Sequence, residues 1–310
     1  MTAQRVIGVV LLAAALVAPW VAYPIFLMTA LCFALFACAF NLLLGYVGLM
    51  SFGHAMFFGI AGYFFGHVVK AWGMAPELGI LAGVAGAAAL GAVTGALAIR
   101  RQGIYFAMIT LAFAQMIYFF CIQAPFTGGE DGLQGIARRP LLGGLLPTKD
   151  DRVLYYVVLA IFLFGYGTIY RIIHSPFGQV LKAIRDNEQR AVSLGYEADR
   201  YKLLAFVLSA ALAGLAGATK AMVLQFATLT DVSAAMSGEV VLMALVGGLG
   251  TIIGPVVGAF IIITMQNYLA AAGEFVLVIQ GVIFVVIVMA FRKGLVGELT
   301  DWWKSRRAAN

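Results

Sequence analysis

Few side chains in this sequence could do chemistry. Ser51 and His54 stand three residues apart, and a histidine that close could activate a serine hydroxyl as a nucleophile. No carboxylate lies near them in the sequence, and their neighbours are apolar and rich in glycine. The pair therefore fits a hydrogen-bonded histidine in an apolar interior better than a hydrolase. A position beside a substrate path is the alternative.

Two further chemistries can be weighed at glycine-rich segments. The run from Gly247 to Gly250 lacks the lysine of a phosphate-binding loop, and the chain has no Gly-x-x-x-x-Gly-Lys-Ser/Thr motif. A second segment has two acidic residues but lacks the regular ligand spacing of a calcium loop; it comprises Thr127, Gly128, Gly129, Glu130, Asp131 and Gly132. We expect a tight glycine turn there, no metal and no cofactor in this chain, and any ATP chemistry in a partner.

The composition indicates what must position these residues. Of the 310 residues, 63% are hydrophobic and 11% are charged, and the mean hydropathy is +0.99. A soluble domain carries about 25% charged residues, so this chain cannot cover a soluble surface and lipid must do so. Cys32, Cys38 and Cys121 lie in or beside apolar runs, and we interpret them as small packing residues.

The apolar runs predict an all-α, polytopic bundle. A membrane-crossing helix needs about 20 largely apolar residues, and this length gives about eight to ten spans, near 6–23, 25–44, 49–69, 78–99, 103–122, 153–170, 203–224, 238–248, 252–270 and 275–291. The run 238–248 is short and 49–69 is rich in glycine, so either could be a broken or re-entrant helix. The first run resembles a signal peptide, but it lacks a small-x-small cleavage site and favours a retained span.

The charges orient this bundle. With the N-terminus inside, most of the 20 Lys and Arg residues fall in cytoplasmic loops, as the positive-inside rule requires. Ten spans also return the C-terminus to the cytoplasm. We expect one transmembrane domain over residues 1–300, an outer loop at 123–152, a cytoplasmic segment at 171–202 and a basic tail at 301–310.

Ionisable residues inside the predicted spans are scarce. Lys220 and Glu239 both lie toward span ends, and Glu274 falls in a turn. A carrier driven by protons or sodium tends to need such groups near the middle of the membrane. The scarcity favours transport driven by another subunit. A self-contained secondary transporter or a channel is the alternative.

The cytoplasmic segment predicts an amphipathic helix. Ser175 and Pro176 form a helix start, and Gly195 is a plausible stop. Between them, apolar residues recur at helical spacing: Phe177, Leu181, Ile184, Ala191 and Leu194. A helix lying on lipid should have a mainly basic polar face, whereas Asp186, Asn187 and Glu188 stand in the middle of this one. Docking to a protein partner is therefore favoured.

Five segments resemble the permeases of branched-chain amino acid ABC transporters. In family order they are Gly45 to Tyr63, Thr127 to Leu133, Lys182 to Gly217, Glu239 to Gly258, and Phe291 to Leu295. Glu130 stands where serine is more usual in the family. Together the segments run from about residue 41 to residue 297, so the resemblance is specific even though each piece alone is not.

The resemblance implies a non-catalytic transport subunit in a bacterial inner membrane. It would form the translocation path with a second, homologous permease, and work with two ATP-binding cassette subunits and a periplasmic substrate-binding protein. Small aliphatic amino acids are the implied substrates, while related permeases carry urea, amides or aromatic acids. Coupling to the ATPases is assigned to the cytoplasmic segment: Pro176, Phe177, Leu181, Ala183, Ile184, Arg185, Asp186, Asn187, Glu188, Ala191 and Gly195.

Small residues recur at every fourth position in two places. One set is Ser51, Ala55 and Gly59, and the other is Gly250, Gly254 and Gly258. Such spacing lets helices approach closely in lipid, and ordinary packing and a role in the path both account for it. We assign Ser51, His54, Ala55, Gly59, Gly250 and Gly254 to a candidate path, and the segment 127–132 to its outer mouth.

Overall fold

The computed structural model describes residues 15–20, 22–144, 148, 150–269, 275–290 and 294–298. The helices are α2 (Pro24–Val47), α3 (Ala55–Lys70), α4 (Pro76–Ala98), α5 (Ile104–Gln123), α6 (Asp151–His174), α7 (Pro176–Asp186), α8 (Glu188–Ser193), α9 (Ala198–Leu224), α10 (Ala234–Gly247), α11 (Gly254–Leu269) and α12 (Phe275–Ala290). Short 3-10 turns are η1 (Pro125–Thr127), η2 (Gly129–Asp131), η3 (Leu142–Gly144) and η4 (Leu229–Val232). The predicted all-α class is confirmed. Most of the first predicted span, 6–23, and the tail 301–310 lie outside the described residues.

The helices differ in whether they are long enough to cross a membrane. Five of them in the described ranges have both the length and the apolar character to do so: α2, α4, α5, α6 and α9. At 1.5 Å per residue, α10 with 14 residues spans about 21 Å and α3 with 16 residues about 24 Å. Both fall short of a hydrocarbon core of about 30 Å. The two runs suspected of being broken thus contain short helices, preceded by backbone that is not α-helical at residues 48–54 and 225–233, the second of which includes η4.

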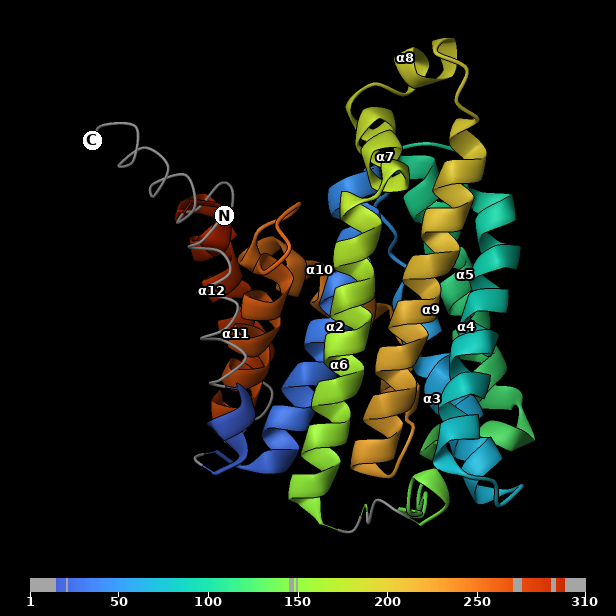
Figure 1. The fold of residues 1–310 in the computed structure, drawn as a ribbon, viewed down its shortest axis with the longest axis vertical. Coiled ribbons are helices and arrows are strands. Elements are labelled where there is room, and N and C mark those ends of the chain that lie inside the picture. The colour runs from blue at the N-terminus through green and yellow to red at the C-terminus, as the bar shows by residue number, and fades with distance from the viewer. Residues whose placement is uncertain are drawn as a thin grey trace.

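The long helix α9 lies at the centre of the bundle. It packs on α2, α3, α4 and α6, and in Figure 1 it stands between α2 and α6 on one side and α3 and α4 on the other. A Cβ atom added at Gly217 would lie 1.8 Å from the carbonyl oxygen of Phe58, and one at Gly214 would lie 2.4 Å from Cβ of Ala87. Glycine therefore lets α9 touch the backbone of α3 directly.

The predicted spacing of small residues is partly confirmed at the contact between α10 and α11. A Cβ atom at Gly258 would lie 1.8 Å from the carbonyl oxygen of Met243, and one at Gly247 would lie 1.9 Å from that of Gly254. Ser51 and Gly250, however, lie outside helices, in the segment before α3 and in the turn before α11. In each set the first residue therefore lies in non-helical backbone and the other two lie on a helix, because the helix begins after the pattern does.

The bundle has two distinct ends. Helices α7 and α8 project from one end, which we call the α7 end, and the connection between α5 and α6 lies at the opposite end, which we call the loop end (Figure 1). At the loop end, Lys70 Nζ donates to the carbonyl of Gln134 at 2.6 Å, and Arg139 Nη1 donates to that of Gly73. The predicted outer loop and cytoplasmic segment are thus on opposite ends of the molecule.

We expect Gly217→Ala to lower the free energy of unfolding by about 1–3 kcal/mol, because the new methyl group must displace the backbone of α3. The matched control is Gly167→Ala on α6, where glycine is exposed and a Cβ atom meets no neighbour within 4 Å. That control should be neutral or slightly stabilising. Thermal unfolding of the two variants in the same detergent measures the difference, and equal melting temperatures would contradict the close contact.

Candidate functional site

The segment 171–202, predicted to be cytoplasmic, contains two short helices between α6 and α9, which corrects the prediction of one. Helix α7 starts as predicted, since Ser175 Oγ accepts a hydrogen bond from the amide of Gly178 at 3.3 Å and Pro176 occupies the first turn. At Asn187 the backbone is extended, with φ −161° and ψ 98°. The Asn187 side chain then accepts from the amide of Arg190 at 2.9 Å and so caps α8. The periodicity is helical on both sides, but asparagine can end one helix by capping the next.

The break changes which apolar side chains are covered. Leu181, Ile184 and Ala191 are buried as the stripe predicts, whereas Leu194 is 71% exposed. Val192 is 53% exposed and Tyr196 40% exposed. We call Val192, Leu194 and Tyr196 the α8 patch. Gly195 ends this segment as predicted, with a φ of +90° that side chains other than glycine rarely adopt.

Arg185 connects α7 to the end of α2. Its Nη1 atom donates to the carbonyl of Gly45 at 2.5 Å, and its Nη2 atom lies 3.0 Å from Oδ1 of Asp186. A Cβ atom at Gly48 would lie 2.9 Å from Cγ of Arg185, so the arginine stem lies against the turn that follows α2. Gly48 also has a φ of +81°, which favours glycine on its own.

The same turn of α2 holds the connection between α10 and α11. Asn41, which is 3% exposed, donates from Nδ2 to the carbonyl of Thr251 at 2.8 Å. Its Oδ1 atom accepts from the amide of Gly250 at 3.0 Å. We call these residues, with Gly45 and Arg185, the Arg185 junction. It joins α7, α2 and the α10–α11 turn.

A second contact ties α8 to α9. Lys202 near the start of α9 is 2% exposed, and its Nζ atom forms an ion pair with Oε1 of Glu188. Phe177 stacks on Tyr201 with ring centroids 5.7 Å apart. Of the remaining predicted coupling residues, Pro176, Ala183, Asp186 and Asn187 are exposed. The segment 171–202 is thus anchored on α2 and α9 and leaves an exposed surface at the α7 end.

His54 is a buried, hydrogen-bonded histidine, as predicted. Its side chain is fully covered, and Nε2 lies 3.2 Å from Oγ of Ser209. Because Ser209 Oγ donates to the carbonyl of Ala39 at 2.5 Å, it accepts from His54, which places the proton on Nε2. Rings of Phe36, Phe40 and Phe57 surround the imidazole at centroid distances of 5.4–5.9 Å.

Two polar atoms at the start of α3 have no hydrogen-bond partner in the described part of the chain. They are Oγ of Ser51 and Nδ1 of His54, both fully buried. The amide of Ala55 donates to Ser237 Oγ of α10 at 3.0 Å. The first turn of α3 therefore meets the first turns of α10 inside the bundle.

The candidate path residues fall into two groups. Ser51, His54, Ala55 and Gly59 lie at the start of α3, where a Cβ atom at Gly59 would lie 2.3 Å from Val232. Gly250 and Gly254 lie at the α10–α11 turn of the Arg185 junction. Helix α10 connects the two groups, because it begins beside the first and ends beside the second.

The segment 127–132 forms the predicted tight turn. Gly128, Gly129 and Gly132 have φ values of 82°, 64° and 69°, and Thr127 Oγ1 lies 2.5 Å from the carbonyl oxygen of Cys121. Glu130 and Asp131 belong to the short turn η2. After this turn, Leu133 and Ala227 exchange two backbone hydrogen bonds of 2.9 Å each.

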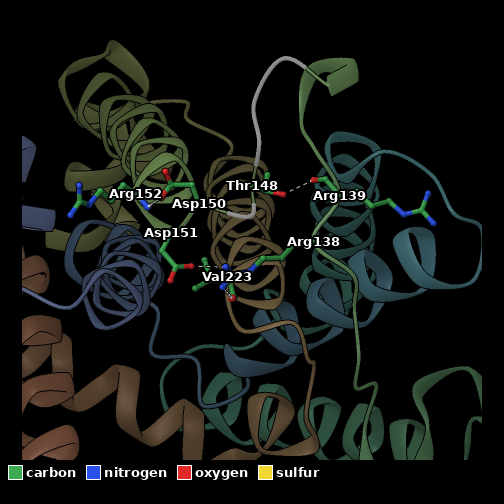
Figure 2. A network of polar contacts seen from close by, with 7 residues as sticks. All are labelled: Arg138, Arg139, Thr148, Asp150, Asp151, Arg152 and Val223. Atoms are coloured by element: carbon green, nitrogen blue, oxygen red, sulfur yellow. Dashed lines mark hydrogen bonds and ion pairs between the residues drawn. The ribbon is translucent and has the colours of Figure 1, made fainter.

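An arginine network at the loop end was not foreseen. Arg138 donates to Oδ1 of Asp151 at 2.5 Å and to the carbonyl of Val223 at 3.0 Å, and Figure 2 shows its side chain between the start of α6 and the end of α9. Thr148 Oγ1 donates to the carbonyl of Arg139 at 2.9 Å. The sequence could have indicated this network, because two arginines at 138–139 and two aspartates at 150–151 lie in the same predicted outer loop.

A buried carboxylate is a second feature that sequence reasoning missed. Asp231 in η4 is 5% exposed and lies 2.5 Å from Nζ of Lys220 on α9. The sequence places Lys220 near a span end without indicating a partner. Asp231 stands in a connection between two predicted spans, where an acidic residue attracts no notice. The signal was the spacing from Thr228 to Asp231, which forms a capping box.

The comparisons with known proteins decide the family. A sequence model described as branched-chain amino acid transport system / permease component matches residues 22–288. The chain belongs to this permease family. The match confirms the family resemblance and covers four of the five segments, since Phe291 to Leu295 lies beyond residue 288. It identifies the helical bundle as that of a multi-pass membrane transport component.

Relatives with curated names are a mixed group of permeases. The high-affinity branched-chain amino acid transport system permease protein LivM of Escherichia coli is 27% identical over 82% of this permease and 65% of its own length. The ribose import permease protein RbsC of Bacillus subtilis is 30% identical over 54% of the chain and 51% of its own. The xylose transport system permease protein XylH of Escherichia coli is 27% identical over 47% and 38%.

The chain therefore spans less than two thirds of the length of the LivM relatives that it matches. No solved structure matches it. The relatives agree on a permease and differ on what is carried.

We expect Asn41→Ala to destabilise the permease by about 1–3 kcal/mol, because the Gly250 amide and the Thr251 carbonyl lose their partner. The control is Thr168→Ala, since that exposed hydroxyl donates only to the carbonyl of Phe164 one turn back in α6. It should change the stability by less than about 0.5 kcal/mol. Thermal unfolding in detergent compares the two, and equal losses would count against the Arg185 junction.

Proposed function

We propose that this permease is one transmembrane subunit of an ATP-driven importer of branched-chain, aliphatic amino acids. It forms the translocation path with a second, homologous permease and takes its energy from two ATP-binding cassette subunits. A periplasmic binding protein delivers the substrate to the loop end. The membrane is the bacterial inner membrane, with both termini in the cytoplasm. The supporting observation is the pair of helices α7 and α8, which together we call the α7–α8 platform, with its exposed α8 patch.

The α7–α8 platform has the properties of a docking site for an ATPase. Helix α8 stands beyond the ends of the neighbouring helices (Figure 1), and the three apolar side chains of the α8 patch are 40–71% exposed. The anchors of the platform are polar: Arg185 donates to the carbonyl of Gly45, and the buried Lys202 pairs with Glu188. A partner that pushed on α8 would therefore displace α2 and α9 together, since both anchors hold.

The Arg185 junction gives that displacement a route into the bundle. Arg185 moves with α7, Gly45 with α2, and Asn41 carries the α10–α11 turn. Helix α10 then reaches the start of α3, where Ser51 and His54 leave two polar atoms unpaired among the described residues. In this proposal the path residues Ser51, His54, Ala55, Gly59, Gly250 and Gly254 change their neighbours when the platform moves. The turn at 127–132 shapes the outer mouth.

The proposed substrate is supported by the extent of the matches. The LivM relative aligns over 82% of the chain, whereas the ribose and xylose permeases align over about half of it. Urea, amides, aromatic acids and sugars are the rival substrates within the same mechanism. A self-contained secondary transporter is the rival mechanism, and it predicts transport by the chain alone without nucleotide.

The test of the function is affinity purification of the tagged permease from detergent-solubilised native membranes. We expect ATP-binding subunits and a second permease to co-purify, and the reconstituted complex with its binding protein to take up leucine only with ATP. Purification of a stable chain alone, active without nucleotide, would favour the secondary transporter. If the complex is ATP-dependent but carries a sugar, the proposed mechanism is supported and the proposed substrate is contradicted.

Docking through the α8 patch predicts a specific loss. The double variant Val192→Glu/Leu194→Glu should lose the ATP-binding subunits in this purification, because two charges would replace exposed apolar contacts. The second permease should still co-purify. Met74→Glu, an exposed apolar residue at the loop end, is the control and should retain every subunit. Loss of ATPases from both variants, or from neither, would contradict docking at α8.

Transmission through Arg185 predicts uncoupling rather than loss of assembly. We expect Arg185→Ala to keep the ATPases bound while ATP-dependent uptake falls about tenfold, because a hydrogen bond from a charged group contributes about 1.5–3 kcal/mol. The control is Arg171→Ala, an exposed arginine near the end of α6. Uptake per ATP hydrolysed is the measurement, and an unchanged ratio in Arg185→Ala would remove this arginine from the route.

A further inference from the structure

The ion pair between Lys220 and Asp231 is buried close to the loop end. The side chains are 8% and 7% exposed, and Nζ lies 2.5 Å from Oδ1. Lys220 stands four residues before the end of α9, which places it about 6 Å along the helix from that end. Ion pairs at this depth are uncommon in membrane helices and usually face a cavity, a partner or a pathway.

The surroundings of the pair combine aromatic rings with an unpaired hydroxyl. Nζ of Lys220 lies 6.0 Å from the ring centre of Phe58 and 5.4 Å from that of Phe226. Phe226 is 36% exposed, so the ammonium group is one side chain away from the surface. Tyr63 is fully buried, and its hydroxyl has no partner among the described residues. It lies one turn of α3 beyond Gly59, which touches the backbone of Asp231.

The segment that carries Asp231 is held by backbone hydrogen bonds and packs on α3, α5 and α10. Gln225, at the start of the segment that leads to Asp231, has a φ of +64°, which is unusual for a residue other than glycine. Residues 225–227 are held to the outer loop by backbone hydrogen bonds from Leu133 and Ile136. Oδ2 of Asp231 accepts from the amide of Thr228 at 3.5 Å. Lys220 thus supplies the strongest contact of the Asp231 carboxylate.

The pair can separate only if each charge finds another partner. A buried charge left alone is far less stable than the pair, while the pair itself adds little stability over an apolar replacement. A neutral sugar offers no charge to either side. A zwitterionic amino acid offers both, with its carboxylate for Lys220 and its ammonium group for Asp231.

We propose that Lys220 and Asp231 form the recognition pair for the zwitterionic head of an amino acid in the outer part of the path. The hydroxyl of Tyr63 is a further donor for the substrate carboxylate, and the rings of Phe58 and Phe226 face an aliphatic side chain. The assignment rests on the proposed function for the substrate class. It also separates this permease from sugar carriers, which need no such pair.

The test compares removal of one charge with removal of both. Lys220→Met and Asp231→Asn each leave a buried charge unpaired, so either alone should impair the permease whatever the role of the pair. The double variant Lys220→Met/Asp231→Asn leaves no charge, and the amide oxygen introduced at position 231 could still accept from the amide of Thr228. A purely structural pair predicts that this double variant transports normally. A recognition pair predicts that it does not.

The measurement is ATP-dependent leucine uptake into proteoliposomes by the complete complex with leucine-loaded binding protein. We expect the double variant to assemble and to hydrolyse ATP at the basal rate of the native complex, but to lose uptake at least about tenfold. The control Arg138→Gln/Asp151→Asn removes an ion pair of equal length at the same end. It should retain uptake within about twofold.

The outcomes separate this proposal from the proposed function. Leucine uptake by both the native complex and the double variant would overturn the recognition pair alone. A native complex that takes up a sugar instead of leucine would overturn both. If the double variant fails to assemble, Lys220→Arg, which keeps a positive charge beside Asp231, is compared with the native complex. A changed apparent KM for leucine uptake supports recognition, because the donor to the substrate carboxylate has a different shape, and unchanged uptake kinetics overturn it.

Discussion

Every backbone amide that leaves a helix inside a membrane must find its partner within the protein, because lipid offers none. Two of the places where the described chain leaves the α-helix within its bundle are residues 48–54 and 225–233. The first segment is satisfied by Thr110, whose hydroxyl accepts from the amide of Phe52, and by Ser237. The second exchanges backbone hydrogen bonds with Leu133 in the connection between α5 and α6. Elements far apart in sequence are thereby fixed to each other.

The same constraint explains why the polar residues lie where they do. Asn41 serves two backbone groups of the α10–α11 turn, and Ser209 serves both His54 and a carbonyl of α2. These polar side chains are thus tied to places where the backbone is not helical or where helices meet. Glycines at other contacts, such as Gly217 and Gly258, bring backbones together where no polar group is needed.

Sequence reasoning predicted the features that depend on local chemistry. Apolar length placed the helices, Ser175 and Pro176 marked the start of α7, and the glycines at 128–132 marked a turn. The sequence-based prediction was wrong where one residue can adopt either of two local structures. Asn187 can continue a helix or cap the next one, and the contacts of α8 with Lys202 go with the second option. Asp231 became significant only through Lys220, a partner on a different helix.

The break at Asn187 divides the platform into two parts with different constraints on their sequences. On the buried face of α7, Leu181 must fit the main core, Ile184 packs with Ala191 and Ala198, and Arg185 must reach Gly45. Val192 and Leu194 on the far side of the break contact mostly solvent, and only Ala191 of α8 is fully buried. Substitutions in α8 can therefore accumulate without repacking the bundle. A subunit built this way can exchange its outward-facing surface, and with it the identity of a neighbour, while the interior stays unchanged.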